Sequence, residues 1–183
     1  MTWLYIILGL LAVLVVAVIG IYNRLAKQKV MVSEASADIE TFQKQRYDMI
    51  PNLVEIVKGY AKHESETFAK VTEMRAKAMG ATSFDEKAKL EDQLSGMVSK
   101  IFAVAENYPQ LKADTNFLGL QTNLKDLEDN IQKSRRYYNG AVRDFNSMIV
   151  IFPTNIIAQV LGFKAEPFFE ASEDEKKNVE IKF

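Results

Sequence analysis

The first 23 residues carry no charged side chain, and this feature constrains the fold more than any other. Within them, residues 3–22 contain nothing more polar than tyrosine and glycine. A helix of this length spans about 30 Å, which is the thickness of the hydrocarbon layer of a bilayer. Trp3 and Tyr5 at one end and Tyr22 at the other are residues that favour the headgroup region. The segment therefore predicts a transmembrane helix, with membrane lipid as the partner of residues 3–22.

A cleaved signal peptide is the competing interpretation of this segment. Signal peptides begin with basic residues, contain about 7–15 apolar residues and end in a small-residue cleavage site. Here no Lys or Arg precedes the apolar run, the run is longer, and no A-x-A site follows it. We therefore favour a retained anchor over residues 1–23. Because Arg24, Lys27 and Lys29 follow it directly, we expect a single-pass protein of the cell membrane whose N-terminus lies outside and whose remainder is cytoplasmic.

Beyond the anchor, apolar residues recur every three and four positions, as in amphipathic helices that pack side by side in coiled-coil fashion. Three such series cover residues 25–78, 90–108 and 117–152. A capping box of Ser83 and Glu86 separates the first two, while Pro109 and Pro153 are expected to end the second and third. Asp114 or Thr115 is expected to cap the helix of the third series, and Thr154 a short helix that closes at Gly162. The pattern predicts an all-α fold, with a single N-terminal transmembrane helix followed by an antiparallel bundle of three to four long helices over residues 24–165.

Two regions of this pattern are ambiguous. Pro51 falls inside the first series without changing its register, so it either kinks one helix or starts another, and we favour the kink. Residues 166–183 are rich in charge and are expected to form a polar C-terminal tail, exposed or disordered. Within this tail, Val179, Ile181 and Phe183 alternate with polar residues and could pair as a strand.

The composition excludes several classes of function. A net charge of −1 argues against nucleic acid, because phosphate binding needs a clustered positive face. The absence of cysteine removes disulfides, thiol nucleophiles and thiolate metal sites. No phosphate loop, dinucleotide fingerprint or nucleophile elbow occurs. We therefore expect no enzymatic activity, no catalytic, cofactor-binding or metal residues, no cofactor and no small-molecule substrate.

The remaining titratable residues are expected to be structural or solvated. His63 is the single histidine and lacks the partners of a metal or catalytic site, so a solvated or capping role is expected. Neighbouring carboxylates, such as Glu91 with Asp92 and Asp126 with Glu128 and Asp129, lie among lysines at helical spacing, which is typical of solvated helix faces.

Arg135 and Arg136 form a weak candidate patch for anionic headgroups or phosphate. Adjacent side chains on a helix point about 100° apart, so we favour an ordinary helix surface on which arginine stems cover aromatic rings. Asn139, Asn146 and Asn155 could bind a ligand, but we expect them to set helix register or to cap the break at Pro153.

A short helix expected after Pro153 carries a compact apolar face that is a candidate interface, formed by Ile156, Ile157, Val160, Leu161 and Phe163. Such a face could dock on a membrane or on a partner protein. Lys164 is the only basic residue in the neighbourhood, which weakens the membrane interpretation. We favour packing of this helix over the open end of the bundle.

Several segments together resemble the LemA family of bacterial membrane proteins. They are Tyr22-Asn23-Arg24, Asp48-Met49-Ile50-Pro51-Asn52-Leu53-Val54, Ala105-Glu106-Asn107-Tyr108-Pro109, Arg135-Arg136-Tyr137-Tyr138-Asn139, Ala141-Val142-Arg143-Asp144-Phe145-Asn146 and Phe152-Pro153. The resemblance covers nearly the whole chain from Tyr22 onward. It implies an N-terminal anchor followed by a helical bundle, and some members are associated with membrane shaping or organelle formation. The resemblance brings no catalytic residues with it.

Two functions follow as expectations. The first is a non-enzymatic, membrane-anchored helical scaffold that forms homo-oligomers or binds other membrane proteins and takes part in membrane organisation or shaping. The alternative is an accessory or regulatory subunit of a membrane protease, transporter or signalling receptor that acts by helix packing. A stable complex with a different protein, without self-assembly, would distinguish the second from the first.

Overall fold

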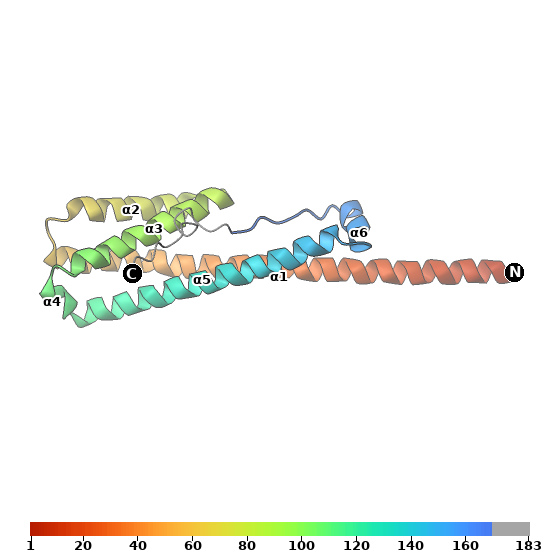
Figure 1. The fold of residues 1–183 in the computed structure, drawn as a ribbon, viewed down its shortest axis with the longest axis horizontal. Coiled ribbons are helices and arrows are strands. Elements are labelled where there is room, and N and C mark those ends of the chain that lie inside the picture. The colour runs from red at the N-terminus through yellow and green to blue at the C-terminus, as the bar shows by residue number, and fades with distance from the viewer. Residues whose placement is uncertain (170–183) are drawn as a thin grey trace, which may run out of the picture. The chain divides into compact units, whose positions relative to one another are not determined.

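The computed structural model describes residues 1–169 and confirms the all-α fold, with no strand in that part of the chain (Figure 1). The helices are α1 (Thr2–Tyr60), α2 (Ser65–Gly80), α3 (Phe84–Ala105), α4 (Pro109–Lys112), α5 (Thr115–Val150) and α6 (Thr154–Val160). The chain divides into two compact units, and both α1 and α5 contribute to each. The first unit comprises residues 1–38 and 134–168, and the second contains residues 39–133.

In the first unit, the apolar beginning of α1 gives way to a packed region within the same helix. Side chains from Trp3 to Ile19 are exposed, whereas Leu25 is fully buried. The buried side chains come from α1, α5 and α6, and are Leu25, Val32, Ala35, Tyr138, Ala141, Val142, Phe145 and Ala158. Among the described residues, α1 is the one helix long and apolar enough to cross a membrane. One long apolar N-terminal helix followed by packed helices is therefore confirmed.

After α6 the chain turns back and is held along α5. Gly162 has a positive φ of 73°, and the amide of Phe163 donates to the Ala158 carbonyl at 2.9 Å, which closes α6 as expected. The side-chain amide of Asn146 bonds to both the N–H and the C=O of Glu166, each at 2.9 Å. The Tyr138 hydroxyl donates to the Pro167 carbonyl at 2.9 Å. The first residues of the expected tail thus contact α5, while its other residues, including 179–183, lie outside the described ones.

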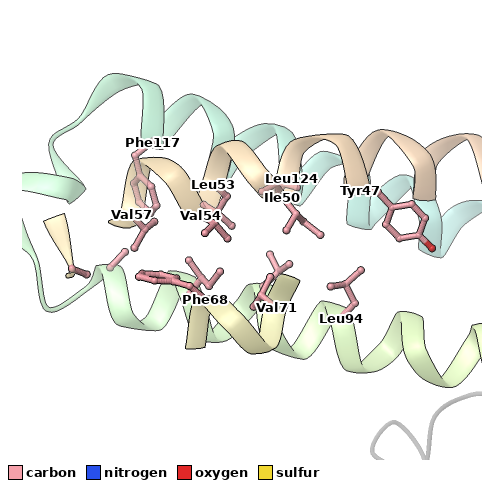
Figure 2. Packing of buried hydrophobic residues seen from close by; sticks show 14 of the residues in the cluster. Tyr47, Ile50, Leu53, Val54, Val57, Phe68, Val71, Leu94, Phe117 and Leu124 are labelled. Carbon is pink, nitrogen blue, oxygen red and sulfur yellow. The ribbon is translucent and has the colours of Figure 1, made fainter. Parts of the chain in front are cut away.

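In the second unit, short turns fold α1, α2, α3 and α5 around a common core that α4 completes (Figure 2). Fully buried side chains from the five helices meet there, among them Leu53, Val57, Val71, Leu94, Ile101, Leu111 and Phe117. The break in the first apolar series falls at residues 61–64, between α1 and α2, and not at Pro51. The first apolar series therefore forms two helices, divided at a different place from the one considered, and the bundle in this unit has four main helices, within the predicted three to four.

α1 passes through Pro51 without ending, as we favoured. A proline inside a helix removes the hydrogen bond to the carbonyl four residues earlier, which here is that of Tyr47. The Nε of Arg75, on α2, donates to this carbonyl at 2.6 Å. A neighbouring helix therefore supplies the hydrogen bond that the proline removes.

The helix ends agree with most of the predicted signals. Ser83 Oγ accepts from the amide of Glu86 at 3.3 Å, and Asp114 Oδ1 accepts from the amides of Asn116 and Phe117 at 2.8 and 3.0 Å. Two expectations were wrong. Pro109 does not end α3, which ends at Ala105, but begins α4. Thr154 does not cap α6 with its side chain but is the first residue of that helix.

Candidate functional site

The most distinctive polar feature of the described residues is a buried cluster in the second unit, built around Arg46 of α1. The side chains of Arg46 and Glu91 are only 2% and 0% exposed, and they form an ion pair. Arg46 Nη1 also lies 2.5 Å from Glu128 Oε2, whose side chain is 34% exposed. The Tyr47 hydroxyl donates to the second oxygen of Glu91. The expectation that Glu91 and Glu128 lie on solvated faces was therefore wrong.

Ser95 completes the cluster. Its Oγ lies 2.6 Å from Arg46 Nη1 and 3.1 Å from Glu128 Oε2. A cleft of about 730 Å³ opens beside these groups, with lining residues that include Arg46, Ser95, Phe102, Lys125 and Asp129. Because both oxygens of Glu91 are engaged within the protein, the cluster has the chemistry of a structural network. Such networks define which helix faces meet.

The sequence did carry a signal for this cluster. Gln43 and Arg46 continue the spacing of the buried Ile39, Ile50 and Leu53 along α1, and all of them are buried. Glu91 similarly lies three residues before the buried Leu94 on α3. A charged residue at an apolar-stripe position on each of two helices is the pattern of a buried pair. The interpretation of the glutamates as solvated overlooked it.

The predicted apolar interface lies in the first unit, where α6 is partly packed and partly exposed. Ala158 is buried, and the Phe163 ring lies 6.3 Å from the rings of both Tyr22 and Phe145. The outer residues of α6 are exposed together with the end of α5. We call these exposed apolar side chains the α5–α6 corner, which consists of Val150, Ile151, Phe152, Ile156, Val160 and Leu161. Ile157 is half-buried, and the predicted set did not include Val150, Ile151 or Phe152.

The other predicted residues are dispersed. Arg136 is exposed and Arg135 is partly buried, so the two guanidinium groups do not share one exposed face. His63 is exposed in the turn between α1 and α2. Asn146 holds the backbone of Glu166, and Asn155 Oδ1 accepts from the amide of Ile156 at 2.9 Å. In the described part of the chain, no group of three or more His, Asp or Glu side chains could hold a metal ion.

Among the groups whose pKa is shifted, Asp114, Tyr60 and Tyr138 lie at a helix end or between packed segments. The backbone amide of Phe117, followed by the hydroxyl of Tyr60, lowers the pKa of Asp114. The same hydrogen bond, at 3.0 Å, raises the pKa of Tyr60. Burial, followed by the charge of Glu166, raises the pKa of Tyr138. These groups hold neighbouring segments together and do not converge on a site where a substrate could react.

Comparison with known proteins gives a consistent set of matches. The model of the LemA family matches residues 35–183. Protein LemA of Metamycoplasma hominis is 30% identical over 164 residues, which is 88% of this chain and 74% of that protein. Magnetosome protein MamQ 2 of Paramagnetospirillum magneticum is 32% identical over 73 residues, or 40% of this chain and 27% of that protein. Magnetosome protein MamQ of Magnetospirillum gryphiswaldense is 28% identical over 72 residues, and the match covers 26% of its length.

Proposed function

We propose a function for this chain, which belongs to the LemA family. The protein is a non-enzymatic helical scaffold anchored in the cell membrane by residues 3–22. The observation that carries this proposal is the continuity of α1, which leads from exposed apolar side chains directly into the packed Leu25 without an intervening loop. A soluble helix normally keeps a polar face, and residues 3–19 have none.

The apolar surface of this segment needs lipid around it. Large side chains point outward on every side of the helix, including Trp3 at 78% exposed, Leu10 at 66% and Val16 at 70%. Apolar surface of this extent is stable only when it is removed from water. Arg24, Lys27 and Lys29 are exposed just beyond it, and they favour an arrangement with the rest of the chain in the cytoplasm.

The scaffold acts by association of helical surfaces, with copies of itself or with other membrane proteins, and thereby takes part in membrane organisation. Among the described residues, the polar groups with the strongest interactions are engaged in holding helices together, which favours a role without chemistry. Three of the matched relatives carry the name magnetosome protein, over 72 or 73 residues. The region shared with these proteins supports a membrane-associated role.

Absolute mass by light scattering tests this proposal, on the full chain in mild detergent and on residues 24–183 in buffer. We expect both to be oligomers, because the bundle carries the self-association. An oligomer only for the full chain would place the self-association in the anchor. If both are monomers, self-association is wrong, and a stable complex with a membrane protease, transporter or receptor becomes the function to seek.

A further inference from the structure

The α5–α6 corner presents a continuous apolar surface to the outside of the first unit. Val150, Phe152 and Val160 are 71%, 75% and 78% exposed. Residues 145–163, which contain the whole corner, carry no charged side chain. An exposed apolar surface without charges among its residues is a feature of sites that contact lipid or another protein.

The position of the α5–α6 corner relative to α1 favours lipid over another protein as its contact. The Phe163 ring, directly after α6, lies 6.3 Å from the ring of Tyr22. Tyr22 is the last residue of the apolar segment, at the level where aromatic side chains meet the headgroups. Figure 1 shows α6 beside α1 at the point where the N-terminal part of α1 continues past the end of α5. The corner therefore adjoins the lipid-facing surface of the anchor.

The corner is held in this position from both sides. Phe163 also packs against Phe145 of α5, and Ala158 of α6 is buried. Beyond α6, Asn146 fixes the backbone of Glu166, and Glu166 Oε1 lies 3.6 Å from Lys29 Nζ of α1. These contacts restrain α6 beside α1, so its exposed side chains keep a constant depth relative to Tyr22.

Basic residues at this level come from α1 and not from α6. Arg24 and Lys27 are exposed within two turns of Tyr22, and Lys164 is exposed after α6. In the sequence, Lys164 is the only basic residue near α6, which by itself weakens the membrane interpretation. The contact between Phe163 and Tyr22 places the corner close to the basic residues of α1, which favours anionic headgroups.

We propose that the α5–α6 corner inserts into the headgroup and upper acyl region of the bilayer that holds the anchor. The protein then contacts lipid at two places, a transmembrane helix and a fixed apolar wedge beside it. Segments that lie in this interface bury their apolar face about 5–10 Å into the boundary between headgroups and acyl chains. The proposal rests on the proposed anchoring of residues 3–22.

The cysteine-free chain allows a direct test on the full-length protein, because a single introduced cysteine is the only site of labelling. Val160→Cys and Leu161→Cys report on the corner, and Leu118→Cys is the matched control. Leu161 and Leu118 are 48% and 45% exposed, so their labels start from similar environments on the protein. Val13→Cys reports on the anchor. Each variant carries the fluorophore NBD and is reconstituted in phosphatidylcholine–phosphatidylglycerol vesicles.

Two quenchers distinguish the possible occupants of the corner. We expect the labels at 160 and 161 to lose fluorescence when part of the lipid carries a nitroxide on the upper acyl chain, and to resist aqueous iodide. The label at 118 should behave in the opposite way. Labels at 160 and 161 that iodide quenches as strongly as the control would overturn the proposal. Labels that resist both quenchers would also overturn it, because protein, such as a second copy of the chain, would then cover the corner.

The label at position 13 tests the anchoring of residues 3–22 separately from the insertion of the α5–α6 corner. If nitroxides deep in the acyl chains quench it while the corner labels respond only to iodide, the anchor is correct and the wedge is wrong. If lipid nitroxides at any depth fail to quench it, anchoring itself is wrong, and the wedge fails together with it.

Discussion

Arg46 is buried, although arginine side chains are mostly exposed to solvent. Its guanidinium group is 2% exposed and lies between two carboxylates. Breaking a buried pair by removing one partner leaves an uncompensated charge. We expect Arg46→Leu to lower the free energy of unfolding by about 3–5 kcal/mol. Urea unfolding of the full chain in mild detergent, followed by far-UV circular dichroism, measures this change.

A paired variant provides the control for this prediction. Arg46→Leu combined with Glu91→Leu removes both buried charges and should recover much of the lost stability, because replacing a whole buried pair by apolar groups is often neutral. The exposed Arg136→Leu should change the free energy of unfolding by no more than about 0.5 kcal/mol. If Arg46→Leu is as mild as Arg136→Leu, the cluster does not stabilise the bundle.

Asp114 leads to a prediction about pH. The amide of Phe117 and the hydroxyl of Tyr60 lower the pKa of Asp114 below its ordinary value of 3.8. A carboxylate with a lowered pKa stabilises the folded state above the ordinary value, and this stabilisation is lost as the pH falls through the lowered one. The gap in Tm between the native chain and Asp114→Ala should therefore be full at neutral pH and should narrow below pH 3.8.

Asp114→Asn isolates the effect of charge in this experiment, because asparagine caps a helix as well as aspartate does but does not titrate. The gap in Tm between Asp114→Asn and Asp114→Ala should be insensitive to pH. A gap between the native chain and Asp114→Ala that is equally insensitive would contradict the role given to the carboxylate.

At the scale of the element, the continuity of α1 through Pro51 depends on a contact from α2. We expect Arg75→Met to lower the free energy of unfolding by about 1–3 kcal/mol, because the Tyr47 carbonyl would lose its donor. Pro51→Ala restores a backbone N–H that can bond to this carbonyl within α1. Arg75→Met should consequently cost less in the Pro51→Ala background.

A double-mutant cycle over Pro51 and Arg75, with unfolding in urea as the measurement, gives this coupling directly. Lys77→Met on the same helix, where the lysine is exposed and paired with Glu73, is the control and should be insensitive to the residue at 51. If Arg75→Met lowers the free energy of unfolding equally in the native and the Pro51→Ala chains, the arginine does not replace the missing hydrogen bond.

The same helix shows which elements can be predicted from sequence. Apolar spacing predicted the helical fold, and Ser83 and Asp114 marked helix starts, because all of these signals are local. Pro51 is also a strong local signal, but Arg75 of another helix compensates for it. The actual break at residues 61–64 has no proline, only Gly59 shortly before it and polar residues within it. Local patterns do not contain contacts between helices. Arg46 and Glu91 each fall at a buried position of an apolar series, which the sequence shows, but their pairing depends on how α1 packs against α3.

At the scale of the whole molecule, the proposed function depends on α1 serving both as anchor and as part of the packed helices. A continuous helix transmits the position of the membrane to the side chains that follow Tyr22, beginning with the buried Leu25. The α5–α6 corner beside Tyr22 fits this arrangement as a second lipid contact. The proposed scaffold role relies on the position and the surface of the helices, in keeping with polar groups that hold helices together.

The proposed function requires that the apolar N-terminal segment stays on the protein, and the intact mass of the protein from membranes washed with alkaline carbonate measures this. We predict that the 183-residue chain, expressed in bacteria, stays in the washed membranes with its full mass of 20.8 kDa. A smaller protein that lacks the apolar N-terminal segment and appears in the wash would identify that segment as a cleaved signal and would rule out its role as an anchor.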